Sequence, residues 1–129
     1  MRIVVTSLDD RFDNLVKPSR RLLLNAAKQL KLSGLVIELY LMEGRLNNKK
    51  TFNVLAFPAP VDFPRPDLPK QKFLGEIYIN PAYIQEHDED LDYMLIHGFL
   101  HLLGYDHHKK DDRINMQKKE DYLLKKLHG

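Results

Sequence analysis

One eleven-residue stretch limits the fold of this chain more than any other. Residues 97–107 read His-Gly-Phe-Leu-His-Leu-Leu-Gly-Tyr-Asp-His. His97 and His101 are four residues apart, so on a helix their imidazoles leave the same face one turn apart. Gly104 can adopt the left-handed conformation that ends a helix, which turns the chain and brings His107 back to that face. The spacing therefore predicts a helix whose end presents three imidazoles to one point.

This helix is apolar on almost every side, so it should be buried. Its apolar residues are Leu91, Met94, Leu95, Ile96, Phe99, Leu100, Leu102 and Leu103. Two imidazoles in such surroundings need either hydrogen-bonded partners in the core or a shared metal ion. Three neutral imidazoles favour zinc and leave one tetrahedral position open, as in catalytic sites. We predict one zinc ion per chain, bound by His97, His101 and His107, with His108 replacing His107 in an alternative register.

The same histidine spacing occurs in zinc peptidases of the HExxHxxGxxH type, but the residue after the first histidine distinguishes this chain from them. Those enzymes carry a glutamate there as general base, whereas this sequence has Gly98. A peptidase without that carboxylate lacks the group that activates its water. The likeness to peptidases is therefore one of geometry, and peptidase activity is the weaker alternative.

The complete string resembles the HGxLHLxGYDH motif of the YbeY family of bacterial metal-dependent endoribonucleases, and every fixed position matches. The resemblance implies a zinc-dependent, single-strand-directed endoribonuclease that acts in ribosomal RNA processing. It implies RNA and the ribosome or a ribosomal subunit as partners, with no DNA and no membrane. A second alternative is a non-catalytic, ribosome-associated module in which zinc only stabilises the fold.

The family resemblance also leaves gaps among the expected catalytic residues. Relatives usually place a helix and an arginine-containing loop where this chain has only the short connection 43–50, and the usual serine of the following strand is Ala56. The nearest basic candidates for the arginine's role are Arg45, Lys49 and Lys50. With Gly98 in place of a carboxylate, transition-state charge should be met by the metal and by such cations.

Asp106 lies directly before the third histidine, and its carboxylate has two competing roles. It can accept a hydrogen bond from an imidazole and so orient a metal ligand, an effect typically worth ~10–100-fold in affinity or activity. It can equally cap the loop that follows. The sequence does not separate these roles, and we treat Asp106 as a candidate catalytic residue.

Composition limits the setting in which the chain works. Its 129 residues with 43% apolar content predict a single domain over residues 1–129. Without cysteine, disulfides and cysteine-type zinc sites are excluded, and a reducing, cytoplasmic location is expected. No run approaches the ~20 apolar residues of a membrane span, and Met1–Val5 lacks the features of a signal peptide. We therefore expect a soluble protein, and the net charge of +2 means that any RNA affinity must come from local clusters of basic residues.

The hydrophobic pattern along the chain predicts an α+β fold. Strands are expected at 3–7, 35–42, 51–57 and 74–79, with a polar loop through residue 14 and a proline-rich surface loop at 58–69. We expect about four strands in one small sheet, mixed by resemblance to the family, with the histidine helix buried against it. A final helix should follow the capping pair Asp111–Asp112 and carry Met116, Leu123, Leu124 and Leu127. Its Met116 and Glu120 resemble the family's ending.

A second helix is expected between Pro18, in its first turn, and Gly34, just past its end. One arc of this helix is apolar and the opposite arc is basic. The apolar residues are Leu22, Leu23, Ala26, Ala27 and Leu30, and the basic ones are Lys17, Arg20, Arg21, Lys28 and Lys31. A solvated surface is the default interpretation of the basic arc, and a track for RNA phosphates is the alternative.

Overall fold

A computed structural model describes residues 1–44, 51–60 and 71–128. Its strands are β1 (Arg2–Ser7), β2 (Leu35–Leu41), β3 (Val54–Pro58) and β4 (Lys72–Ile79). Its helices are the 3₁₀ helix η1 (Asp10–Leu15) and the α-helices α1 (Val16–Gln29), α2 (Pro81–Glu86), α3 (Leu91–Leu102) and α4 (Lys110–His128). Of the expected segments, Arg45, Lys49, Lys50 and most of the proline-rich loop lie outside the described residues.

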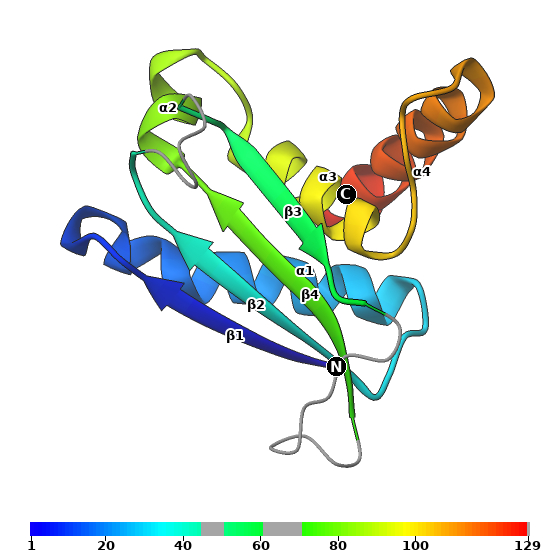
Figure 1. Cartoon of the computed structure of the whole chain (residues 1–129), viewed down its shortest axis with the longest axis horizontal. Coiled ribbons are helices and arrows are strands. Elements are labelled where there is room, and N and C mark those ends of the chain that lie inside the picture. The colour runs from blue at the N-terminus through cyan, green and yellow to red at the C-terminus, as the bar shows by residue number, and fades with distance from the viewer. Residues whose placement is uncertain (45–50, 61–70, 129) are drawn as a thin grey trace.

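The strands form one mixed sheet in the order β1-β2-β4-β3 (Figure 1). β1 pairs with β2 and β2 with β4 in parallel, whereas β3 runs antiparallel to β4 at the edge. The expected α+β class with a small mixed sheet is confirmed. The expected strand positions are right to within a few residues, the largest shift being at β3, which starts at Val54 rather than at Thr51.

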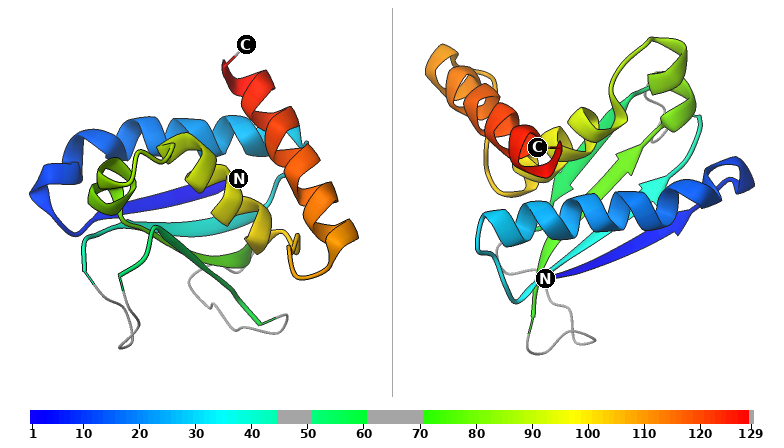
Figure 2. Two further views of the ribbon diagram at one scale, coloured as in Figure 1. Left: turned by 90° about the horizontal axis from the view of Figure 1, so that it is seen from above. Right: turned by 180° about the vertical axis from the view of Figure 1, so that it is seen from behind.

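The helices α1, α3 and α4 lie on one side of the sheet (Figure 2). α1 packs against β1, and α3 packs against β3 and β4. The side chains at Ile37, Leu39 and Leu41 alternate with outward-facing neighbours, and each is fully buried beneath these helices. The core thus lies between the sheet and this helical layer, and α3 lies at its centre.

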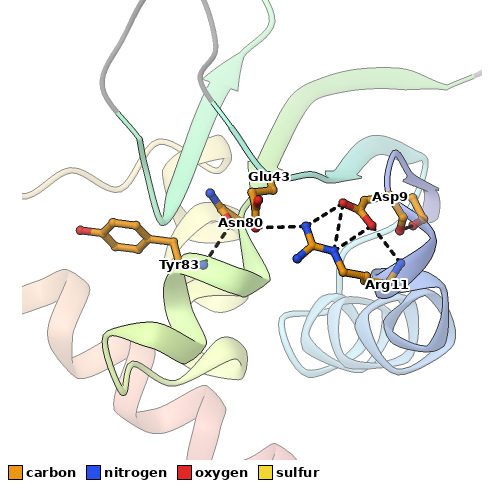
Figure 3. Close-up of polar contacts among 6 residues, drawn as sticks. Asp9, Arg11, Glu43, Asn80 and Tyr83 are labelled. Carbon is orange, nitrogen blue, oxygen red and sulfur yellow. Dashed lines mark hydrogen bonds and ion pairs between the residues drawn. The ribbon is translucent and has the colours of Figure 1, made fainter.

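Residues 10–15 form a short helix where a polar loop was expected, because local side chains stabilise its start (Figure 3). The Asp9 carboxylate accepts a hydrogen bond from the backbone N–H of Arg11 at 3.0 Å, which is an N-cap contact. The Arg11 guanidinium pairs with Asp9 at 2.8 Å and with Glu43, after β2, at 3.0 Å. These exposed contacts hold η1 beside the end of β2.

α1 starts as expected, with Pro18 in its first turn, but it ends earlier than predicted. The left-handed residue that closes the helix is Lys31, with φ of 56°, and not Gly34. The Leu32 N–H donates to the Ala27 carbonyl, and the Lys31 N–H donates to the Lys28 carbonyl. These are the two hydrogen bonds of a Schellman motif. Gly34, with φ of 70°, instead serves the turn into β2.

Asn80 and Pro81 directly follow β4 and begin the short helix α2, which the sequence pattern did not predict. The Asn80 side chain is buried and accepts a hydrogen bond from the Tyr83 N–H at 3.0 Å, while Pro81 occupies the first helical turn (Figure 3). Asn-Pro therefore combines an N-cap with a proline that needs no N–H there. Within the described part of the chain, none of the helices combines the length and apolar character that a membrane span requires.

Candidate metal centre

Helix α3 is fixed by an aspartate cap at its start and by the predicted glycine turn at its end. At its start the Asp90 carboxylate accepts hydrogen bonds from the N–H groups of Asp92 and Tyr93, at 3.0 and 3.4 Å. At its end Gly104 has φ of 99°, and the Tyr105 N–H donates to the Leu100 carbonyl at 3.0 Å. This Schellman motif reverses the chain direction, as predicted from the glycine. The reversal is what returns residue 107 to the helix.

The three predicted ligands come together in space. One ring nitrogen from each of His97, His101 and His107 lies within 4.8 Å of the other two. The Nε2 atoms of His97 and His101 are 3.2 Å apart, so both rings point to a common position. His107 is exposed, and the other two are half-buried. Three convergent imidazole nitrogens suit a divalent transition metal, and this donor set could hold one ion.

Burial and neighbouring positive charge favour the neutral form of His101. The pKa of His101 is lowered first by burial and then by the charges that His97 and His107 carry when protonated. A hydrogen bond to the backbone of Tyr105 and the charge of Asp106 oppose this shift. Because a metal binds only the neutral ring, a lowered pKa favours ligation at neutral pH.

The imidazoles open into a cleft of about 380 Å³ between α3 and the edge strand β3. Its other walls are residues 53–56, together with Tyr93, Met94 and Gly98. Ala56, which replaces the family's usual serine, is part of this apolar wall. None of the described residues that line the cleft carries a carboxylate or a positively charged side chain. A bound metal would therefore dominate the local charge.

Gly98 is buried, and its backbone packs closely against side chains of the sheet. A Cβ atom at this position would lie 3.1 Å from the Cγ2 atoms of both Ile77 and Val54. Even alanine would therefore be crowded at this position. The peptidase alternative lacks the general base that would activate its water.

The remaining site candidates differ in where they lie. Asp106 accepts a hydrogen bond from the His108 N–H at 2.6 Å, and this bond is the main cause of its lowered pKa. The loop-capping role is thus present, while its role toward an imidazole stays a prediction.

His108 is exposed and stacks on His107 with ring centroids 5.3 Å apart, outside the three-histidine group. The proposed roles of Arg45, Lys49 and Lys50 also stay predictions, because these residues lie outside the described ones.

Sequence reasoning gave no role to Glu120, although it contacts a metal-ligand candidate. It is 2% exposed, and its Oε2 lies 2.7 Å from Nδ1 of His97. A signal was present in the sequence, because Glu120 interrupts the apolar stripe formed by Met116, Leu123 and Leu127. A charged residue on a buried helix face needs a polar partner. The partner lies 23 residues away and could not be read from local spacing.

Comparison with known proteins agrees with the motif. A family model described as Endoribonuclease YbeY matches residues 41–128, which include β3, β4 and the helices α2 to α4. The chain belongs to the YbeY family. The Endoribonuclease YbeY of Leptospira interrogans is 36% identical over 106 residues, covering 66% of this chain and 75% of that protein.

Other YbeY relatives match shorter segments. The protein of Anaplasma marginale is 45% identical over 62 residues, 42% of this chain and 40% of its own length. That of Rhizobium leguminosarum is 39% identical over 87 residues, 60% of this chain and 49% of its own length. The chain thus spans half or less of these two YbeY proteins. Residues 1–40, which include β1 and α1, precede the segment matched by the family model.

Proposed function

We propose that this chain is a zinc-dependent endoribonuclease that cleaves single-stranded RNA during ribosomal RNA processing. The observation that carries the proposal is the cluster of three imidazoles, open to a cleft, in a member of the YbeY family. The relatives' shared name, Endoribonuclease YbeY, supports RNA as the substrate. The proposal includes association with the ribosome and a cytoplasmic location.

The cleft suits an anionic substrate. Its described lining has no carboxylate that would repel a phosphodiester, and residues of β3 form one wall. When bound, zinc would supply Lewis acidity toward a phosphoryl oxygen and would lower the pKa of a coordinated water molecule. His97, His101 and His107 would hold the ion and leave its fourth position accessible from the cleft.

In this proposal the described residues of the cleft hold the metal and shape the space for the phosphate, and none of them is a carboxylate base for the attacking oxygen. Gly98 provides no general base, and the Tyr93 hydroxyl is engaged with Glu120 at 3.2 Å. Met94 and Ala56 contribute apolar side chains to the walls of the cleft. Cations at Arg45, Lys49 and Lys50 would meet the developing phosphate charge, with lysine acting as a point charge rather than a bidentate fork.

The test is cleavage of labelled single-stranded and duplex RNA of one sequence, before and after treatment with a chelator. We expect cleavage of the single strand, its loss on chelation and its recovery on addition of zinc. A peptide library and the same zinc-loaded protein form the second arm. Cleavage of peptides but not RNA would establish the peptidase alternative, and binding of zinc without cleavage of either would establish the non-catalytic module.

A further inference from the structure

Among the described residues, Glu120 is the one charged side chain that is buried. It lies on α4, between Met116 and Leu123, each no more than 1% exposed. Taking a carboxylate out of water is costly unless both oxygens find partners. Both do so on α3: Oε2 contacts His97 Nδ1 at 2.7 Å, and Oε1 accepts from the Tyr93 hydroxyl at 3.2 Å.

The contact with Glu120 determines which nitrogen of His97 faces the cleft. An imidazole that donates its Nδ1 proton to a carboxylate carries its lone pair on Nε2. That Nε2 atom lies 3.2 Å from Nε2 of His101, on the side where the three rings converge. Tyr93 in turn restrains the carboxylate, and its ring stacks on the ring of His97 with centroids 6.0 Å apart.

We propose that Glu120 is the positioning residue of the metal centre, and this rests on the proposed function. By accepting the Nδ1 proton, it holds the His97 ring in the tautomer and orientation that a metal requires. The role belongs to a residue of α4, whereas the ligands come from α3 and the turn that follows it. Docking of α4 and metal binding are therefore linked, and each favours the other.

The linkage has a structural basis in how α4 is held. The helix packs against α3 and α1 through buried Met116 and Leu123. An exposed pair, His128 with Asp92 at 2.8 Å, joins its end to the start of α3. When α4 opens, Glu120 leaves His97 and the ring is free to rotate. A metal that binds only the closed arrangement must reduce this opening.

The experiment measures zinc affinity by competition with a chelator, in the complete chain, for the wild type, Glu120→Gln and Asp121→Asn. Asp121 is the matched control, an exposed acid on the same helix whose contact is with Gln117. We expect Glu120→Gln to weaken zinc binding by ~10–100-fold, because a neutral amide is a poorer acceptor of the Nδ1 proton. Asp121→Asn should bind zinc as the wild type does.

Two further readouts separate positioning from simple stabilisation. The visible spectrum of the Co²⁺-loaded protein should change in Glu120→Gln, because the ligand ring is held differently. Zinc should slow hydrogen exchange of α4 amides in the wild type and do so less in the variant. Unchanged zinc affinity, Co²⁺ spectrum and zinc-induced protection in a folded Glu120→Gln protein would overturn the proposal.

If Glu120→Gln does not fold, Tyr93→Phe decides the matter. This variant removes only the hydroxyl that restrains the carboxylate, and we expect a several-fold loss of zinc affinity. Wild-type affinity in Tyr93→Phe would then overturn the proposal. A wild-type protein that binds no zinc would instead show that the proposed metal centre itself is wrong.

Discussion

Helices α1 and α3 pack on the same side of one sheet, yet their polar groups do different things. α1 buries one arc and exposes a basic one, where Lys17, Arg20 and Arg21 line a shallow hollow of about 400 Å³. α3 is buried on most sides, and the half-buried His97 and His101 line the cleft. Polar residues on the exposed face of an amphipathic helix need no special explanation, whereas imidazoles on an otherwise apolar helix do.

Removing a ligand from α3 should have the largest effect. We expect His101→Ala to weaken zinc binding by ~100-fold or more, because structural zinc sites gain roughly 10–16 kcal/mol from about four ligands. Asn25→Ala on the exposed face of α1 is the control and should leave zinc binding unchanged. The measurement is chelator competition. Wild-type zinc affinity in His101→Ala would show that α3, like α1, does not provide metal ligands.

Removing charge from α1 should have a smaller effect, on RNA binding alone. Lys17 and Arg21 are exposed, and if their basic arc follows an RNA strand, the double alanine variant should bind RNA several-fold more weakly. The slope of log affinity against log salt should fall by about 1.4, two contacts at ~0.7 each for a single strand. Lys118→Ala with Lys125→Ala on α4 removes equal charge elsewhere. If the two double variants bind alike, the basic arc of α1 is a solvated surface.

The packing of the two helices can be compared by replacing one residue of each with alanine. Gly98→Ala introduces a Cβ atom 3.1 Å from methyl groups of Ile77 and Val54. Overpacking typically costs ~1–3 kcal/mol and the better helix propensity of alanine offsets about 1, so we expect a net loss of about 1 kcal/mol. Asn25→Ala should instead stabilise the fold by roughly 0.5 kcal/mol. Urea unfolding of the metal-free proteins measures both changes in the free energy of unfolding. A Gly98→Ala protein more stable than the wild type would show that β3 moves away from the added methyl group at little cost.

The lowered pKa of His101 predicts how the stability of the metal-free protein depends on pH. Above pH ~6.5 His101 is neutral in the folded and the unfolded state, so its ionisation does not change the free energy of unfolding. As the pH falls below ~6.5, the unfolded chain binds a proton before the native state does, so the free energy of unfolding decreases until the pH passes the folded pKa. Denaturant midpoints between pH 8 and 5 should fall less steeply in His101→Gln than in the wild type. Identical slopes would contradict the assigned shift.

The features predicted correctly from sequence depend on neighbours a few residues apart. The spacing of His97, His101 and Gly104 specifies a helix and its closing turn, and both were found. Lys31 was missed because glycine is the usual left-handed residue, and Gly34 stood nearby. The helix starting at Pro81 was not predicted, because its six residues are too few for a clear hydrophobic period.

Features that depend on contacts between distant parts of the chain could not be predicted from local sequence patterns. Alternation places Ile77 and Ile79 on one face of a strand, but it does not say that β4 lies between β2 and β3. The family resemblance supplied the mixed character of the sheet. Glu120 needed the tertiary structure, since only the docking of α4 on α3 shows that its partner is His97.

The central claim is that the three imidazoles of this chain form one catalytic metal centre. The most direct measurement is single-turnover cleavage of single-stranded RNA while zinc is titrated into metal-free protein. We predict that the rate rises with added zinc and saturates at one ion per chain, with no rise in His101→Ala. Cleavage that is indifferent to zinc, or an equal response in His101→Ala, would contradict the claim.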